Sequence, residues 1–165
     1  MLSNIKSDFK VNYSTLSKLV CINYRLGNYA YRRSNLLLKV LYKLTNFITK
    51  IISNSDISAR STIGKSLRLE HGGQGVVIHS SATIGEDARI FHQTTIGIAG
   101  KAENEVAAVI GDNISFGAGA KIIGELQIGN DVKVGANTVV TKNLKDGSVV
   151  VGSSMRILNQ EVHSQ

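Results

Sequence analysis

Two histidines, His71 and His92, are spaced so that both side chains could act on one substrate. Each follows an apolar residue by two positions, since His71 comes after Leu69 and His92 after Ile90. An imidazole, with an ordinary pKa of about 6.5, is suited to removing a proton near neutral pH. Outward histidines are also common as solvated surface residues or as a hydrogen-bonded ladder, so the spacing alone leaves catalysis open.

The elements that would position these histidines follow a period of six residues from Ile57 onward. Neither a helix nor a single alternating strand sustains such a period, whereas short strands wound into a parallel β-helix do. Successive coils lie about 4.8 Å apart, and the gap from His71 to His92 is one 18-residue coil plus three residues. We therefore expect both imidazoles on the same side. The apolar positions are Ile57, Ile63, Leu69, Ile78, Ile84, Ile90, Ile96, Ile110, Phe116, Ile122, Ile128, Val134 and Val140.

Two interruptions of the period are candidates for function. Three residues are inserted between Leu69 and Ile78, around a glycine-rich segment that a ligand could approach closely. Fourteen residues separate Ile96 from Ile110, which predicts a protruding loop over residues 98–108. Long irregular excursions from a compact scaffold are commonly functional.

The first 52 residues differ from the repeats in charge and in periodicity. They hold nine Lys/Arg against one acid, Asp8, whereas the other 113 residues hold ten basic and eleven acidic groups. The sequence pI of about 9.6 therefore describes this segment, and no nucleic-acid partner is expected. An amphipathic helix is predicted over 36–52 and further helix over 14–33, with a turn or cap at Gly27-Asn28. The apolar face of the helix over 36–52 consists of Leu37, Leu41, Leu44, Ile48 and Ile51.

These patterns divide the chain into three expected parts: a basic α-helical segment (1–52), a β-helix domain (53–148) and a C-terminal cap and tail (149–165). The helices either cover one end of the solenoid, pack on a sister subunit, or contact an anionic membrane surface. Charged residues interrupt every long apolar run, so neither a signal peptide nor a transmembrane helix is expected. The single cysteine, Cys21, fits a reducing compartment. We expect a cytoplasmic protein, at the inner face of the membrane if the helices bind lipid.

A resemblance to a known family rests on the strings LEHGGQGVVIHSSATIGEDARIFHQTTIG and IGDNISFGAGAKIIGELQIGNDVKVGANTVVT. They resemble the serine acetyltransferase branch of the hexapeptide-repeat acyltransferases. They also resemble the short members that O-acetylate exopolysaccharide, such as the colanic acid acetyltransferases. The match spans about residues 55–158. It implies an acyltransferase enzyme with a left-handed parallel β-helix, assembled as a homotrimer, with acetyl-CoA bound as co-substrate between neighbouring subunits.

The resemblance implies His71 as the general base and Asp56, fifteen residues earlier, as the carboxylate that pairs with it. The imidazole would take the proton of the acceptor hydroxyl as its oxygen attacks the thioester. A carboxylate at the second ring nitrogen would fix the tautomer and stabilise the imidazolium. Because the acceptor hydroxyl is itself the nucleophile, no covalent enzyme intermediate is needed.

The acetyl-CoA positions of the family fall on small residues here, namely Gly97, Ala118, Gly119 and Ala136. Small side chains would let the pantetheine arm lie flat against the wall of the coil. Lys142 is either a contact for a CoA phosphate or a solvated corner lysine.

Several departures from the serine-specific pattern bear on the acceptor. Val106 and Ala107 stand where the serine-specific enzymes have an Arg-His pair, and Glu70 stands where they have aspartate. We therefore expect the acceptor to be a sugar hydroxyl of a capsular or exopolysaccharide precursor, positioned by Glu70 and His92. The alternative is a serine O-acetyltransferase that makes O-acetylserine for cysteine biosynthesis.

Two other classes of function stay open. A metal enzyme of the γ-carbonic anhydrase kind could use His71 and His92 as ligands, but His79 lies in another phase of the repeat and is poorly placed as a third. No metal is therefore expected. The second is a non-catalytic β-helix that only binds a ligand or serves as a scaffold, in which case the spacing of Asp56 and His71 would be a coincidence.

Overall fold

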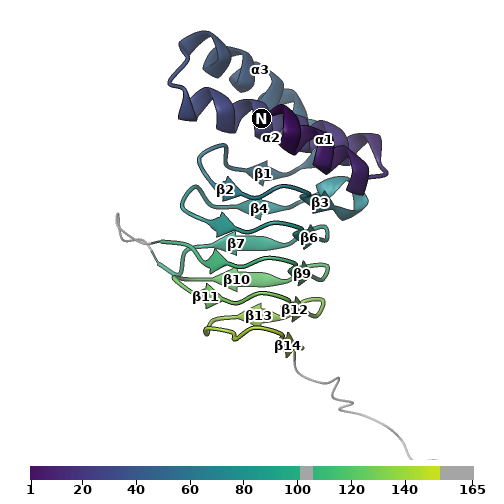
Figure 1. Cartoon of the computed structure of the whole chain (residues 1–165), viewed down its shortest axis with the longest axis vertical. Helices are drawn as coiled ribbons and strands as arrows, with labels where there is room; N and C mark the ends of the chain where they lie inside the picture. Colours follow the sequence, from purple (N-terminus) through teal and green to yellow (C-terminus); the bar gives the residue numbers. More distant parts are fainter. Residues whose placement is uncertain (101–105, 153–165) are drawn as a thin grey trace, which may run out of the picture.

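The computed structural model describes residues 1–100 and 106–152, which form a column of short strands with three helices at one end (Figure 1). The helices are α1 (Leu2–Val11), α2 (Thr15–Arg32) and α3 (Leu36–Ser53). The described strands are β1 (Asp56–Ile57), β2 (Thr62–Ile63), β3 (Arg68–Leu69), β4 (Val77–Ile78), β5 (Thr83–Ile84), β6 (Arg89–Ile90), β7 (Thr95–Gly97), β8 (Val109–Ile110), β9 (Ser115–Phe116), β10 (Lys121–Ile123), β11 (Gln127–Ile128), β12 (Lys133–Val134), β13 (Val139–Val140) and β14 (Val149–Val150).

The strands form three parallel sheets, and each turn of the chain contributes successively to all three. We call them sheet A (β1-β4-β7-β10-β13), sheet B (β2-β5-β8-β11) and sheet C (β3-β6-β9-β12-β14). Pairing keeps one register through the coils, as where Ile57 faces Ile78 and Ile78 faces Ile96. The left-handed parallel β-helix with a short helical N-terminal segment, predicted from the six-residue period, is confirmed.

The periodic apolar residues fill the inside of the column, because each is the inward residue of a strand. All thirteen positions of the period are buried, from Ile57 at 6% exposure to Phe116 at 0%. Most residues two positions before them are buried as well, including Ala82, Ala88 and Ala120. Burial of this continuous stack is the main stabilising contribution, since each large aliphatic side chain adds about 1.5–3 kcal/mol.

Helix α2 closes the first coil of the column. Val20, Cys21 and Tyr24 belong to the same core cluster as Ile63 and Leu67. The turn or cap predicted at Gly27-Asn28 is wrong, since α2 runs unbroken to Arg32. The glycine instead allows close packing, because a Cβ at Gly27 would collide with the Tyr42 ring of α3.

A buried ion pair fastens α1 and α2 to the coil. Asp8 is fully buried and Arg25 is 3% exposed, with Nε of Arg25 2.8 Å from the Asp8 carboxylate. The backbone N–H of Leu67 donates to Asp8, and the Arg25 guanidinium donates to the carbonyls of Ile63 and Gly64. Both charges are therefore paired and hydrogen-bonded, as burial requires.

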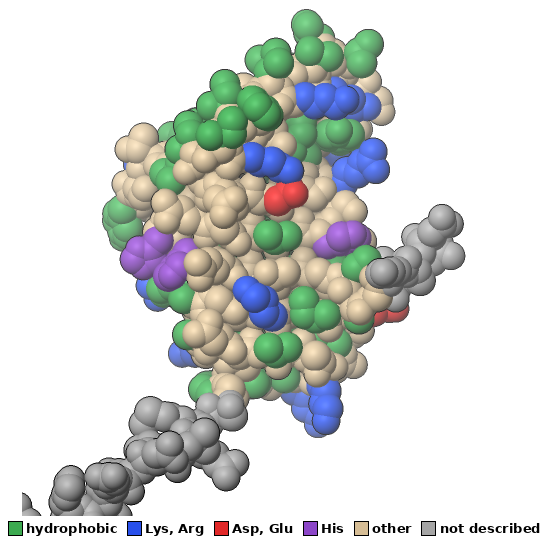
Figure 2. All heavy atoms as spheres, turned by 180° about the vertical axis from the view of Figure 1, so that it is seen from behind, with side chains coloured by type: hydrophobic (Ala, Val, Ile, Leu, Met, Phe, Trp, Pro, Cys, Tyr) green, Lys and Arg blue, Asp and Glu red, His purple; other side chains and the backbone are tan. Residues whose placement is uncertain are grey.

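Helix α3 turns much of its apolar face outward. Side chains exposed by at least 46% include Leu36, Leu37, Val40, Leu41, Leu44, Phe47, Ile48, Ile51 and Ile52. Hydrophobic side chains accordingly gather over the helical end in Figure 2. No helix in the described part of the chain is both long enough and apolar enough to span a membrane.

The boundary expected between the helical segment and the β-helix domain lies close to the end of a helix. Helix α3 ends at Ser53, Asn54 caps it in the left-handed conformation (φ 50°), and β1 begins at Asp56. Strand β14 lies within the expected cap and pairs with β12. Residues 101–105 of the loop and 153–165 of the tail lie outside the described residues.

Candidate functional site

The three-residue insertion forms a tight turn at the corner where sheet C passes into sheet A. This turn, η1 (Glu70–Gly73), holds His71 at φ 51° and ψ 39°, in the left-handed region. Gly72 and Gly73 follow with positive φ, a conformation that glycine adopts at little cost. The glycines thus permit a turn that projects His71 from the corner, which we call the histidine corner.

Successive turns stack on this corner. The N–H of Gln93 donates to the carbonyl of Gln74, that of Gly119 to His92, and that of Asn137 to Ala118, each at 2.8–3.0 Å. The predicted proximity of His71 and His92 is confirmed, because their ring centroids lie 5.0 Å apart in an edge-to-face contact. Histidine side chains appear at both edges of the face shown in Figure 2.

His71 opens into a pocket of about 210 Å³ between the α1–α2 turn and the η1 turn. Its polar lining comes from Asn12, Tyr13, Ser14, Ser17, Arg68 and Glu70. Asn12 and Ser17 are tied to the backbone of Leu67 and Leu69, so the helices set this wall of the pocket. The contribution of Asn12, Tyr13 and Arg68 was missed from the sequence, because no repeat pattern links α1 and α2 to the histidine corner.

Glu70 lies between Arg68, which lines the same pocket, and Arg89, which lines a neighbouring pocket of about 370 Å³. Its Oε1 is 2.7 Å from Nε of Arg68 and 2.8 Å from Nε of Arg89. The two arginines face each other in register on β3 and β6. The sequence did contain a signal for this cluster, because Arg68 and Arg89 stand 21 residues apart, the same separation as His71 and His92.

His92 contacts the ring of His71 but does not line the same pocket. It lines a second pocket of about 210 Å³ with Asn54, Gln74, Gly75 and Gln93. Its Nδ1 is buried and has no hydrogen-bond partner among the described residues. The predicted role of His92 in positioning the acceptor stays a prediction.

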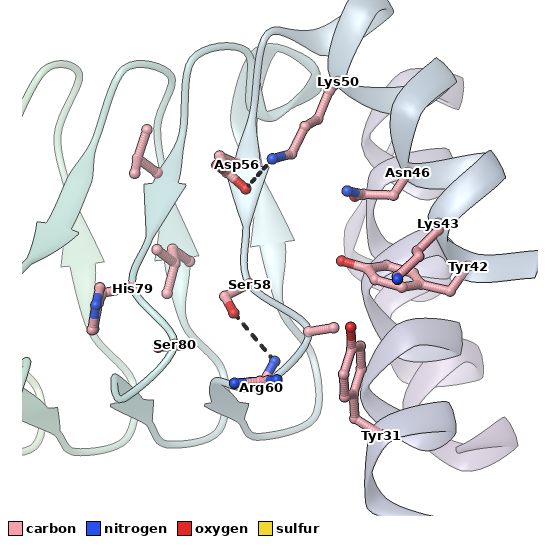
Figure 3. Close-up of a pocket in the computed structure, with 13 residues that line it drawn as sticks. Tyr31, Tyr42, Lys43, Asn46, Lys50, Asp56, Ser58, Arg60, His79 and Ser80 are labelled. Atoms are coloured by element: carbon pink, nitrogen blue, oxygen red, sulfur yellow. Dashed lines mark hydrogen bonds and ion pairs between the residues drawn. The ribbon is translucent and has the colours of Figure 1, made fainter. Parts of the chain in front are cut away.

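Asp56 contacts helix α3 in this single chain. Its carboxylate pairs with Nζ of Lys50 at 2.7 Å, and both side chains are about half exposed (Figure 3). The two line a pocket of about 470 Å³ with Tyr31, Tyr42 and His79. In that pocket burial raises the pKa of Tyr42 to about 12. No contact joins Asp56 to His71 within residues 1–100 and 106–152, so their pairing stays a prediction.

The residues expected to bind acetyl-CoA fall at two edges of sheet A. Ala118, Gly119 and Ala136 stack below His92 on the histidine corner. Gly97 ends β7, and Lys142 follows β13 by two residues, so both lie where sheet A turns toward sheet B. One copy of the chain therefore presents two separate groups of these residues.

The last residues of the predicted loop are packed against the coil. Ala107 is fully buried and its N–H donates to Oγ of Ser81 at 2.9 Å, while Val106 is 37% exposed. Neither side chain can form an ionic contact with an acceptor. Residues 101–105 between the two coils are outside the described residues.

His79, considered above as a third metal ligand, lies apart from His71 and His92. Nδ1 of His79 lies 2.8 Å from Oγ of Ser81 at the edge opposite the histidine corner. Across the described ranges no group of three His, Cys, Asp or Glu side chains is placed to hold a metal ion. Cys21 is no candidate nucleophile, because burial raises the pKa of its thiol.

Comparisons with known sequences agree on one kind of protein. The family pattern described as bacterial transferase hexapeptide (six repeats) matches residues 107–142. A serine acetyltransferase of Helicobacter pylori is 37% identical over 150 residues, which are 90% of this chain and 84% of the relative. One from Mycobacterium tuberculosis is 33% identical over 83% of this chain and 58% of the relative.

Solved structures give the same result. Serine acetyltransferase isoform 3 of Entamoeba histolytica, in complex with cysteine, matches with a TM-score of 0.83 at 25% identity. The match covers 96% of this chain and 60% of that one. The soybean serine acetyltransferase apoenzyme matches with a TM-score of 0.76 at 31% identity, over 87% of this chain and 57% of that one. The present chain thus spans less than two thirds of these solved chains. The further resemblance to exopolysaccharide O-acetyltransferases is not supported by these comparisons.

Proposed function

The chain belongs to the serine acetyltransferase family of hexapeptide-repeat acyltransferases, and from this we propose that it acetylates the hydroxyl of L-serine with acetyl-CoA. The observation that carries the proposal is the small pocket in which His71 lies beside Glu70. A base and a carboxylate side by side suit an acceptor with both a hydroxyl and an ammonium group. The product would be O-acetylserine, and its expected use is cysteine biosynthesis.

The reaction needs one proton acceptor and no covalent enzyme intermediate. His71 takes the proton of the serine hydroxyl as the oxygen attacks the thioester carbonyl of acetyl-CoA. A new C–O bond forms, the C–S bond breaks, and the proton on His71 passes to the leaving sulfur. Glu70 and His92 hold the acceptor against the base.

Asp56 is proposed to orient His71 and stabilise its charged form. For this the carboxylate must leave Lys50, either within the chain or across a contact with a second copy. The exposed Asp56–Lys50 pair contributes little to stability, about 0–1 kcal/mol, so this rearrangement is inexpensive.

The acetyl-CoA site is proposed to form between two copies in a homotrimer. One copy would supply Ala118, Gly119 and Ala136 from its histidine corner, and its neighbour would supply Gly97 and Lys142 from the opposite edge of sheet A. This arrangement explains why the two groups of residues lie apart in one chain. Lys142 would then contact a phosphate of CoA.

The saccharide acceptor expected from the sequence has less support than L-serine. The observation in its favour is that Val106 and Ala107 offer no charge at the positions where the serine-specific enzymes have an Arg-His pair. The relatives that match are serine acetyltransferases, which favours the serine alternative.

Two further parts of the sequence-based interpretation remain proposals. A cytoplasmic location is kept because acetyl-CoA and a reducing environment are both found there. Membrane contact through residues 1–52 has no support from the comparisons, and the exposed apolar face of α3 would equally suit another protein surface.

Release of free CoA from acetyl-CoA tests the function directly. Purified chain should release the thiol with L-serine and form O-acetylserine, which mass spectrometry identifies. L-alanine is the matched control, since it has the same charged groups without the hydroxyl and should give no release above background. Turnover with a saccharide but not with L-serine would contradict the proposal.

A further inference from the structure

A charged cluster at the edge of the pocket beside His71 contains more positive than negative groups, with Arg68 and Glu70 lining that pocket and Arg89 lining the neighbouring one. Two guanidinium groups, on Arg68 and Arg89, meet a single carboxylate, Glu70. The cluster therefore holds a net positive charge next to the proposed base. Glu70 is only 19% exposed, so this charge is partly shielded from water.

These contacts do not use the Nη donors of the two arginines or the second carboxylate oxygen of Glu70. Each arginine reaches Oε1 of Glu70 through Nε, and no hydrogen bond from the Nη atoms of either arginine is found among the described residues. Oε2 of Glu70 accepts no hydrogen bond there either. Paired Nη donors of a guanidinium match the two oxygens of a carboxylate.

Each guanidinium group also lies over an aromatic ring. Arg68 lies over the ring of Tyr13 at 5.4 Å, and Arg89 lies over the ring of Phe91 at 4.9 Å. The Phe91 ring is in turn 6.3 Å from that of His71. Stacking of this kind limits the motion of an arginine and preserves the direction of its donors.

From this geometry we propose that Arg68 and Arg89 bind the carboxylate of the amino-acid acceptor, and so select L-serine over uncharged alcohols. The inference rests on the proposed serine acetyltransferase activity. The acceptor ammonium would bind Oε2 of Glu70, its carboxylate the free Nη donors, and its hydroxyl would face His71. Strands β3 and β6 would thus supply the positive charge that Val106 and Ala107 do not supply.

The test compares L-serine with L-serinamide, which keeps the hydroxyl and the ammonium group but lacks the negative carboxylate. Arg68→Gln and Arg89→Gln are measured singly, so that Glu70 keeps one partner, and Arg33→Gln on the exposed end of α2 is the matched control. We expect each cluster variant to raise KM for L-serine by about tenfold or more, because a charged hydrogen bond is lost. KM for L-serinamide and for acetyl-CoA should stay within about twofold.

The outcomes separate the two proposals. A KM increase confined to L-serine supports the inference, and kcat should change less than KM because binding is what is weakened. Equal increases for both acceptors, or no increase for either, would overturn it while leaving the serine acetyltransferase activity standing. If the unaltered chain does not acetylate L-serine at all, both proposals fail together.

Discussion

At the scale of single residues, the backbone of His71 has a left-handed conformation that also occurs at Gln93 and Asn137, on the same corner of later coils. A residue other than glycine in the left-handed region costs about 1–3 kcal/mol, and such conformations persist where the surroundings enforce them. Here the enforcement comes from the stacked corner below and from α2 above. The conformation therefore belongs to the geometry of the coil corners, and it sets the direction in which the His71 side chain leaves the backbone.

Replacing His71 by asparagine should remove the base while keeping the turn, because asparagine tolerates left-handed backbone. We expect kcat with L-serine to fall by about 10²–10⁴-fold. Steady-state CoA release measures this. Lys65→Ala, which removes an exposed ion pair with Glu86, serves as the control and should keep near-normal turnover. A His71→Asn variant with full activity would refute the base assignment.

At the scale of elements, the η1 turn depends on glycine for two separable reasons. Gly72 has φ +75°, and a Cβ there would lie 2.6 Å from Cδ2 of Leu16 on α2. Gly147 has a similar φ of +70°, but a Cβ added there would meet nothing within 4 Å. Substitutions at these two glycines therefore separate the cost of a positive φ from the cost of crowding against α2.

Gly72→Ala should destabilise the fold by more than Gly147→Ala, which carries only the backbone cost of about 1 kcal/mol. We expect an additional loss for Gly72→Ala, together with reduced activity, since the crowding displaces η1 or Leu16. Denaturant unfolding monitored by circular dichroism compares the variants. Equal losses for both would show that α2 does not constrain the turn.

The buried Asp8–Arg25 pair should be far more important for stability than an exposed pair. Asp8→Ala leaves Arg25 buried and unpaired, and we expect the free energy of unfolding to fall by about 3–5 kcal/mol. Lys65→Ala breaks the exposed Lys65–Glu86 pair and should cost about 0–1 kcal/mol. Comparable losses, measured by urea unfolding, would contradict the role of the pair in fastening the helices.

The elements also show which parts of the molecule were predictable. The period of six identified the inward residue of each strand from β1 to β13, because strand stacking repeats one geometry in each coil. The same regularity placed His92 beside His71. Contacts between the helices and the coils follow no such repeat, so the unbroken α2 at Gly27 and the lining by Asn12 and Tyr13 were not foreseen. Nor was the Asp56–Lys50 pair, which depends on where α3 ends.

At the scale of the whole molecule, the proposed donor site requires more than one copy of the chain. We expect a particle of three times the 17.8 kDa chain mass by light scattering. Acetyl-CoA should bind this trimer, and its affinity should fall when dilution separates the copies. A monomer that binds acetyl-CoA with undiminished affinity would contradict a site between copies.

The described helices lie over one end of the column (Figure 1), and this gives the molecule a direction. In a solenoid each coil is held only by its neighbours, so we expect the coils beneath a packed helix to open less readily than the others. Hydrogen exchange should then run as a gradient, fastest at β13 and β14 and slowest beneath α2. The coils that hold Ala118 and Ala136 would loosen before the turn that holds His71. Transient fraying would accordingly release the donor-binding wall first, while the proposed base stays anchored.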